Sequence, residues 1–437
     1  MSVAAATAPR KAKPATGLSR GVMESMLFRF TGLMLVFLLH LLLARLMGPK
    51  GFGDYTMITS LLDLLLIISL FGMDSATQRI LPQALAKKEF GDANGFLRFS
   101  YRWILVASVS CSVIVLALLI FVYKKGSVGF RESILWMILL LPILATVHQA
   151  SAVLRSFQRI KASMLPIHVV LPVILSLATA IYYFEYGKLP VDAVLLLQLA
   201  VTLLVGWRVS RTTGKRLREQ LDRSKTEYRF FKWFTVASGH FVTSLMEVLL
   251  RQGDILMVGY LATHVYAGQY AAAVRITSLV VFALSVADYV YLPRLAAMAK
   301  SGKKRQLRLS VRSFSREILL ATLPLAVLLA LAGPWLLAAF GTSFKNAYVP
   351  LLILLVGHLF TAGTGLAGGM MQLTGDRRTY VGYSITSVMI LFTLLAVLLP
   401  KWGLTGAALS SLTARLLLQL FCYRRLYRRT GIRAGII

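Results

Sequence analysis

Long apolar runs of about twenty residues alternate with short polar turns along the chain. A helix rises about 1.5 Å per residue, so about twenty apolar residues are needed to cross a bilayer. The pattern therefore predicts an all-α polytopic membrane protein with about twelve transmembrane helices. The expected spans cover residues 22–44, 55–78, 103–123, 133–153, 164–184, 191–208, 233–258, 269–292, 317–340, 348–371, 380–399 and 404–423.

The order of segments repeats between the two halves of the chain. The stretch 52–55 (Phe-Gly-Asp-Tyr) opens one apolar run, and 267–270 (Ala-Gly-Gln-Tyr) opens another in the second half. Pro82 and Pro293 lie near the ends of these runs, and close to half of the chain separates them. Such repeats are common in transporters whose binding site lies between the repeated units. We expect two pseudo-repeated six-helix lobes with basic flanking segments, divided as 1–21, 22–209, 210–231, 232–423 and 424–437.

Lysine and arginine are distributed unevenly between the two sides of the predicted membrane. The chain has 48 of them against 17 acidic residues, and its net charge is +31. With the N-terminus in the cytoplasm, 36 fall in cytoplasmic tails and loops, eight in outer loops and four inside spans. Cytoplasmic loops of membrane proteins carry such an excess, so both termini are predicted to be cytoplasmic. The charge also attracts anionic headgroups, so we expect membrane lipids, and no nucleic acid, as partners.

The N-terminal segment 1–21 is basic, and the first acidic residue is Glu24. A transit peptide is one interpretation of this tail, and an ordinary cytoplasmic anchor is the other. The first apolar run is long enough to span a membrane and lacks a clear small-residue cleavage site, so we expect an uncleaved helix. Cys111 and Cys422 both fall in predicted spans and form no disulfide framework or metal motif. No metal or cofactor is therefore expected.

Charged residues inside the spans are the first candidates for a functional site. A charge at the centre of a membrane helix costs about 2.5–3.5 kcal/mol on insertion scales. The seventh span, 233–258, contains Glu247, Arg251 and Asp254, whose spacings of four and three residues place them on one helical face. That face is expected to point toward protein or water and not toward lipid. The arginines predicted to lie inside spans are Arg29, Arg251, Arg275 and Arg415.

Three turn motifs, in a fixed order, resemble those of a known family. Residues 48–55 follow a Gly-Pro-x-x-Phe-Gly-x-Tyr pattern, 268–270 repeat its Gly-x-Tyr, and 403–408 read Gly-x-x-Gly-Ala-Ala. The pattern is similar to the polysaccharide branch of the multidrug/oligosaccharidyl-lipid/polysaccharide exporter superfamily, over about residues 20–425. The resemblance implies two six-helix lobes that form a V around a central cavity.

The branch that this chain resembles most contains the O-antigen and capsule repeat-unit flippases. The resemblance implies an inner-membrane protein of bacteria that moves undecaprenyl-pyrophosphate-linked oligosaccharides outward for lipopolysaccharide or exopolysaccharide biosynthesis, with polysaccharide polymerase machinery as a partner. Lipid II flippases are related, but they usually carry two further helices that we do not find in this sequence. Multidrug exporters share the fold, so a multidrug exporter and a lipid II flippase remain as alternatives.

A pyrophosphate substrate needs fixed cations, and the planar fork of arginine grips phosphate oxygens in pairs. Arg29, Arg251 and Arg275 are therefore the candidates for substrate binding. Two of them have a structural alternative, because Arg251 could form a helix ion pair with Glu247 or Asp254 and Arg29 could snorkel to the inner interface. Arg275 lies deeper and has fewer nearby charges in the sequence. Arg415 is more simply interpreted as packing between helices.

The acidic residues within the spans are candidates for coupling transport to an ion gradient, or else for buried polar structure. They are Asp63, Glu247, Asp254 and Asp288. Four histidines in the spans lack metal-ligand spacing, so we expect them to be hydrogen-bonded helix residues. They are His40, His148, His240 and His358.

Two other classes of function fit the sequence less well. A membrane-bound glycan polymerase or ligase would need a catalytic constellation, but no loop exceeds about 25 residues and no nucleophile constellation is visible. A purely structural scaffold would not explain the charges inside the spans. The protein is therefore expected to be a transporter and not an enzyme.

Overall fold

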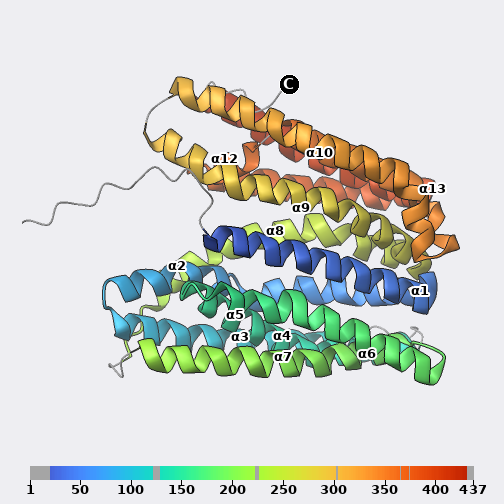
Figure 1. Ribbon diagram of the computed structural model, residues 1–437, viewed down its shortest axis with the longest axis horizontal. Coiled ribbons are helices and arrows are strands. Elements are labelled where there is room, and N and C mark those ends of the chain that lie inside the picture. The colour runs from blue at the N-terminus through green and yellow to red at the C-terminus, as the bar shows by residue number, and fades with distance from the viewer. Residues whose placement is uncertain are drawn as a thin grey trace, which may run out of the picture.

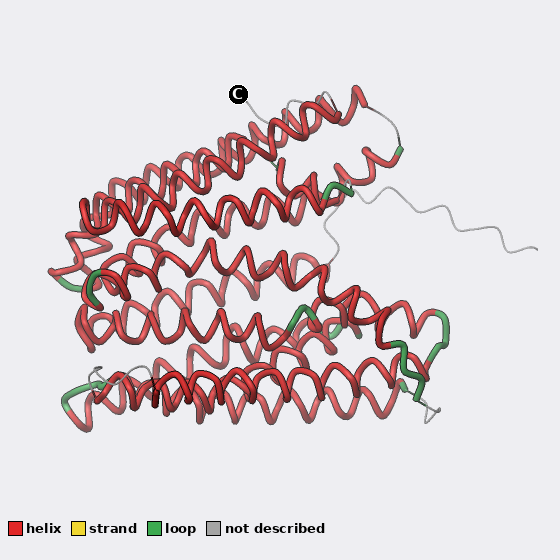
Figure 2. Tube along the Cα trace, turned by 180° about the vertical axis from the view of Figure 1, so that it is seen from behind, coloured by secondary structure: helices red, strands yellow, loops and turns green. Residues whose placement is uncertain are grey.

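The computed structural model describes residues 20–121, 128–221, 226–301, 304–364, 366–373 and 375–430. The regular structure within these residues is entirely helical, as Figure 2 shows. The all-α prediction is therefore confirmed. Most of the predicted N-terminal tail, part of the central linker and the end of the C-terminal tail lie outside the described residues.

The first half of the chain forms one very long helix, a short helix and a series of spanning helices. The long helix α1 is broken at Gly48, which has φ 71° and ψ 179°. The elements are α1 (Arg20–Leu70), α2 (Met73–Ala86), α3 (Phe90–Phe121), α4 (Val128–Ser156), α5 (Ile160–Leu165), the π-helical turn η1 (Pro166–Val170), α6 (Leu171–Tyr186) and α7 (Val191–Gln220).

The second half ends in another long, broken helix. In α13 the break is at Gly403, with φ 55° and ψ −137°. The elements are α8 (Phe230–Leu261), α9 (His264–Lys300), α10 (Lys304–Phe340), the 3₁₀ turn η2 (Thr342–Ala347), α11 (Tyr348–Thr364), α12 (Ala367–Leu373) and α13 (Arg377–Thr430).

Ten helices among the described residues are long and apolar enough to cross a membrane. Two of them, Met23–Leu70 and Arg377–Arg429, contain 48 and 53 residues, enough for two crossings each. Both change direction at the glycines that were expected to form turns, Gly48 and Gly403. Counting these two helices twice gives the twelve spans that the sequence predicts.

Two predicted spans end earlier than expected. The second was predicted to reach residue 78, but α1 ends at Leu70, and Phe71 and Gly72 form a turn with φ 47° and 73°. This turn is pressed against α8, where the Phe71 ring stacks on Phe241 at 4.5 Å. The tenth span was predicted over 348–371, but α11 ends at Thr364 and a separate helix follows. A packed aromatic turn and a glycine-rich segment thus interrupt what hydropathy presents as continuous runs.

The helices of the two halves lie side by side, with α1 and α8 between them (Figure 1). Helix α1 packs against both α8 and α9 along this boundary. Both ends of the described chain lie at one end of the molecule (Figure 1), which we call the basic end because the sequences of its loops are rich in lysine and arginine. The breaks in α1 and α13 lie near the start of α9, because a Cβ on Gly268 would meet the Pro49 carbonyl and one on Gly403 would lie 3.8 Å from the Tyr266 ring. We call this region the glycine end.

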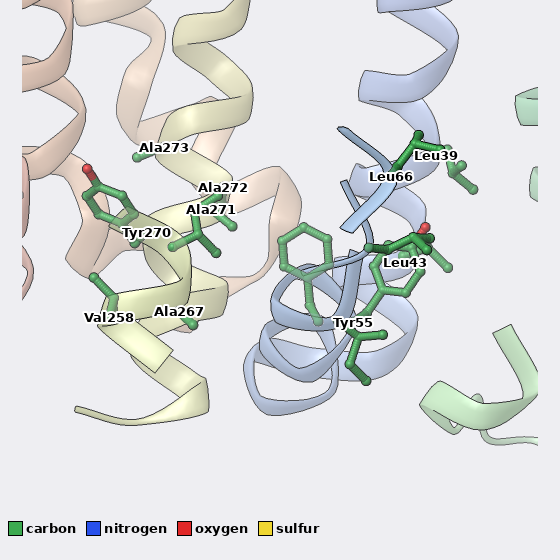
Figure 3. Close-up of a cluster of buried hydrophobic side chains, with 14 of the residues drawn as sticks. Leu39, Leu43, Tyr55, Leu66, Val258, Ala267, Tyr270, Ala271, Ala272 and Ala273 are labelled. Atoms are coloured by element: carbon green, nitrogen blue, oxygen red, sulfur yellow. The ribbon is translucent and has the colours of Figure 1, made fainter. Parts of the chain in front are cut away.

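One apolar core extends across the boundary between the halves. Leu39, Leu43 and Tyr55 of α1 belong to it, together with the small residues 271–273 of α9 (Figure 3). Small side chains let helix backbones approach closely in membrane proteins. The two halves can therefore pack tightly toward the glycine end.

Candidate functional site

A cavity of about 780 Å³ lies where α1, η1, α8, α9, α11 and α13 meet. Its volume is within the range of about 300–1,000 Å³ that is common for ligand sites. Five of the seven residues predicted for the site line this cavity. The charged and titratable lining residues are Asp63, His168, Glu247, Arg251, Asp254, Arg275, His358 and Arg415. Because three of them are arginines, we call it the arginine cavity.

Helix α8 supplies three of the charges. Glu247, Arg251 and Asp254 all line the arginine cavity, as expected from their spacing on one face of the helix. Neither ion pair considered from the sequence, Arg251 with Glu247 or Arg251 with Asp254, is present within 4.0 Å among the described residues. Arg251 is instead exposed.

Three arginine side chains reach the cavity. In the part of the chain that the structure describes, the guanidinium groups of Arg251, Arg275 and Arg415 make no hydrogen bond or ion pair. The Nε atoms of Arg275 and Arg415 are buried and unpaired. Asp63 and Arg251 lie close enough to interact electrostatically with the guanidinium group of Arg275. A buried donor without a partner is costly, so these groups are suited to an anionic ligand.

Arg415 lines the cavity in addition to packing between helices. Packing between helices was the simpler expectation, and its Nε is indeed buried. Its side chain nevertheless lines the cavity from α13, whereas the other two arginines come from α8 and α9. The sequence carried a signal for this, because Arg415 is a charge inside a predicted span.

The carboxylate of Asp254 is engaged in structure. Its side chain is 1% exposed and accepts hydrogen bonds from Tyr270 Oη at 2.9 Å and from Ser411 Oγ at 2.9 Å. These bonds join α8, α9 and α13. Asp254 therefore fixes the arrangement of the helices that carry the three arginines.

Asp63 is held by an amide from the other half of the chain. Its Oδ2 accepts a hydrogen bond of 2.8 Å from Gln252 Nε2, and Gln252 Oε1 accepts one of 3.3 Å from Ser60. This network links α1 to α8. Glu247, by contrast, has no hydrogen bond or ion pair among the residues described.

Arg29 and Asp288 lie outside the arginine cavity. The Arg29 guanidinium is 5.5 Å from the centre of the Tyr289 ring, and both line a small pocket with Phe282. Phe282 also lines the arginine cavity, so Arg29 adjoins it. Asp288 lines a second cavity of about 590 Å³ in the second half, which shares Glu247 with the first.

Histidines contribute to the site in a way that the sequence did not reveal. His358 lines the cavity, and so does His168, which was not among the candidates. The only sequence signal for His168 is its place between Pro166 and Pro172, where the helix widens into a π turn. His40 behaves as expected, with Nδ1 2.6 Å from the Val36 carbonyl oxygen. No group of three or more metal-ligating side chains was found among the described residues.

The boundary between the halves is closed at the glycine end. Gly53 and Gly268, the equivalent glycines of the two repeats, lie backbone against backbone, and a methyl group on Gly53 would overlap the carbonyl oxygen of His264. His264 also pairs with Asp54 across the boundary. Phe52 packs beside them against Phe344, with ring centres 6.0 Å apart. The repeated motifs therefore meet each other and seal this end.

The comparisons with known proteins agree with this architecture. A family model described as "Polysaccharide biosynthesis protein" matches residues 18–299. Among curated protein sequences, none matches this chain.

Solved structures show the same fold at low sequence identity. An inward-facing multidrug resistance MATE family transporter of the MOP superfamily has a TM-score of 0.76 and 13% identity, covering 94% of this chain and 98% of that one. The outward-facing conformation of such a transporter has a TM-score of 0.68 and 13% identity, with coverages of 94% and 96%. A third structure is a MOP superfamily transporter from Pyrococcus furiosus, whose reversed pocket polarity is described as suggesting a different function. It has a TM-score of 0.69 and 13% identity, covering 94% of this chain and 95% of that one.

The resemblance drawn from the turn motifs is thereby confirmed. The chain belongs to the polysaccharide biosynthesis protein family, and its multi-span helical fold is that of the solved MOP superfamily transporters.

Proposed function

We propose that this protein moves an undecaprenyl-pyrophosphate-linked oligosaccharide repeat unit across the bacterial cytoplasmic membrane, from the inner to the outer leaflet. Its family supports a lipid-linked sugar as substrate. The observation that carries the finer proposal is the set of cavity arginines, Arg251, Arg275 and Arg415, which no described protein group neutralises through an ion pair or hydrogen bond.

A pyrophosphate matches these arginines chemically. Charges inside a membrane protein are expensive, and they persist where they pair or where they serve a ligand or ion pathway. Arginine binds phosphate oxygens through two parallel hydrogen bonds, and such charge-assisted bonds are worth about 1.5–3 kcal/mol each. Arg29, beside the cavity toward the basic end, would meet the head group first and pass it to Arg275 and Arg251.

Two alternatives receive less support. A cationic drug would favour a cavity dominated by acids, whereas here Asp63 and Asp254 are already hydrogen-bonded and Glu247 shares its cavity with three arginines. Lipid II flippases usually have two helices more than the twelve spans within the described residues. The multidrug alternative is an outcome of the test below.

The transport cycle that fits this architecture is alternating access. Residues 22–209 would rock against 232–423, with the basic end and both termini in the cytoplasm. Closure at Gly53 and Gly268 supports a state in which the cavity is reached from the cytoplasmic side. Opening of this end would release the repeat unit outward, where polymerase machinery can use it.

The test uses bacteria that lack their own repeat-unit flippase and produce this protein. We expect the protein to restore surface polysaccharide and to lower the accumulated lipid-linked repeat unit, without a change in drug resistance. Arg275→Ala should slow this restoration about ten- to a hundredfold, and Arg275→Lys should recover part of it. Arg208→Ala, which removes an exposed arginine outside the cavity, is the matched control. Drug resistance without restored polysaccharide would contradict the proposal.

A further inference from the structure

The second cavity, of about 590 Å³, lies wholly between helices of the second half of the chain. Its lining differs in kind from that of the arginine cavity. Among the described residues, no lysine, arginine or histidine lines it. The polar lining residues include Glu247, Asp288, Tyr289, Gln372, Tyr380 and Gln419.

The two cavities adjoin at Glu247, which lines both. Arg251 and Arg377 act electrostatically on Glu247. Glu247 also interacts electrostatically with Asp288, which lies in the second cavity. Glu247 therefore lies between Arg251 in the arginine cavity and Asp288 in the second cavity.

Several polar groups of the second cavity have no partner among the residues that the structure describes. Neither Glu247 nor Asp288 makes a hydrogen bond or ion pair there. The Oε1 atom of Gln419 is buried and accepts no hydrogen bond. These groups are mainly acceptors, and the amides and phenols beside them can also donate. A ligand rich in hydroxyl groups, with apolar ring faces to lie against Tyr380, satisfies such a lining.

We propose that this second cavity is a subsite for the sugars of the lipid-linked substrate, and that it selects glycans that are neutral or carry an amino group. The proposal rests on the function proposed above, with the pyrophosphate in the arginine cavity. The first sugar is bonded directly to the pyrophosphate, so its subsite must adjoin the arginines, as this cavity does through Glu247. A uronic acid would bring a negative charge to the carboxyl groups of Glu247 and Asp288, where no cationic side chain among the described residues lines the cavity, and like charges brought together are strongly unfavourable.

The test measures binding of three short-chain probes to the purified full-length protein. The probes are a prenyl pyrophosphate, the same lipid carrying a neutral disaccharide, and the same lipid carrying a disaccharide with one uronic acid. The wild-type protein should bind the neutral glycan about tenfold more tightly than the bare lipid, since one hydrogen bond to a carboxylate is worth at least that factor. It should bind the acidic glycan at least tenfold more weakly than the neutral one.

Variants separate the two subsites. Asp288→Asn should remove most of the preference for the neutral over the acidic glycan while leaving the affinity for the bare prenyl pyrophosphate within twofold. Arg275→Ala should weaken all three probes by a similar factor. Glu185→Gln, at an exposed carboxylate outside both cavities, should change none of them.

The outcomes distinguish this inference from the proposed function. Equal binding of neutral and acidic glycans by the wild-type protein would overturn the inference alone, and this comparison needs no variant to fold. If Asp288→Asn changed the affinity for all three probes by the same factor, the inference would also be overturned, and a role of Asp288 in coupling transport to an ion gradient would be favoured. Failure of the wild-type protein to bind any of the probes would overturn both proposals.

Discussion

Charged side chains pair with each other at the glycine end, whereas the arginines of the arginine cavity have no described partner. At the glycine end, Asp54 and His264 pair across the boundary between the halves, beside the backbone contact of Gly53 with Gly268. In the cavity, Arg275 and its two neighbouring arginines have no described partner. Both regions lie on the same boundary, and both are formed by α1 and α9 together with other helices.

Under the proposed function, the difference separates charges that hold a conformation from charges that bind a ligand. A paired charge at the boundary stabilises the closed state and must be separated when that end opens. An arginine without a described partner is costly inside a membrane protein, and under the proposed function this cost is offset when it binds the pyrophosphate. Changes at the glycine end should therefore alter which conformation is populated, and changes in the cavity should alter affinity for an anion.

The largest effect is expected at the backbone contact of the glycine end. In Gly53→Ala, the added methyl group would overlap a backbone carbonyl that cannot move independently. The end then cannot close, and transport should fall more than about a hundredfold, because an overlap with backbone lies at the top of the range of about 1–3 kcal/mol that overpacking costs, and about 3 kcal/mol is more than a hundredfold. Cysteine labelling near Ala267 should rise in parallel.

Gly382→Ala is the matched control for this change. Gly382 also lies in a helix, but its added methyl group would meet nothing within 4 Å. Alanine favours helix over glycine by about 0.5–1 kcal/mol, so this variant should be as active as the wild type and slightly more stable. Normal transport by Gly53→Ala would show that closure at this contact is unnecessary.

Breaking the contact between Asp54 and His264 should have an intermediate effect. Asp54→Asn removes a charge-assisted contact worth about 1.5–3 kcal/mol and should raise labelling of a cysteine at the glycine end at least tenfold. His264→Asn should do the same, and the double variant should be no worse than either single one, because both changes break one interaction. Additive effects would show that the two side chains act independently.

The control is a surface ion pair that does not cross the boundary. It joins Arg216 and Glu219, 2.6 Å apart within α7. Its removal should cost less than about 1 kcal/mol and should leave labelling at the glycine end unchanged.

The smallest effect is expected at a paired charge outside the spans. A hydrogen bond from Arg425 and one from Thr379 lower the pKa of Asp376. A carboxyl group whose folded-state pKa is lowered stabilises the protein above its unfolded pKa, about 3.9, and loses this contribution as the pH falls through the folded value. Asp376→Asn should therefore be less stable than the wild type at pH 7, by less than about 1 kcal/mol.

Thermal unfolding at two pH values checks this prediction. The difference in stability between the wild type and Asp376→Asn should be present at about pH 7 and should shrink at about pH 3. A difference that stays constant over this range would show that Asp376 acts through its shape and not through its charge. Transport should be unaffected at neutral pH, since Asp376 lines neither cavity.

Much of the fold could be predicted because it depends on local patterns. Run length indicated the spans, and the spacing of Glu247, Arg251 and Asp254 indicated their shared face toward the cavity. The turn at Phe71 and Gly72 could not be predicted from hydropathy, since the apolar character continues through it. It depends on stacking with Phe241, which lies in the other half of the chain.

The site was predictable in composition and less so in geometry. The repeat indicated that Gly53 and Gly268 are equivalent, but it did not show that the two glycines touch each other. The partners of Asp254, at Tyr270 and Ser411, follow from the packing of three helices and leave no mark in the sequence. The roles of the arginines in binding and of the acids in ion coupling stay predictions.

The most direct test of the central claim is flipping of a prenyl-pyrophosphate-linked disaccharide by purified protein in lipid vesicles. Arg29→Ala, Arg251→Ala and Arg275→Ala are compared with the wild type, each checked for folding and insertion. Each arginine is expected to contribute charge-assisted contacts to the anionic head group, so Arg275→Ala should flip the lipid about ten- to a hundredfold more slowly. If all three variants insert normally and flip the lipid at the wild-type rate, the arginine cavity does not bind the pyrophosphate and the account is wrong.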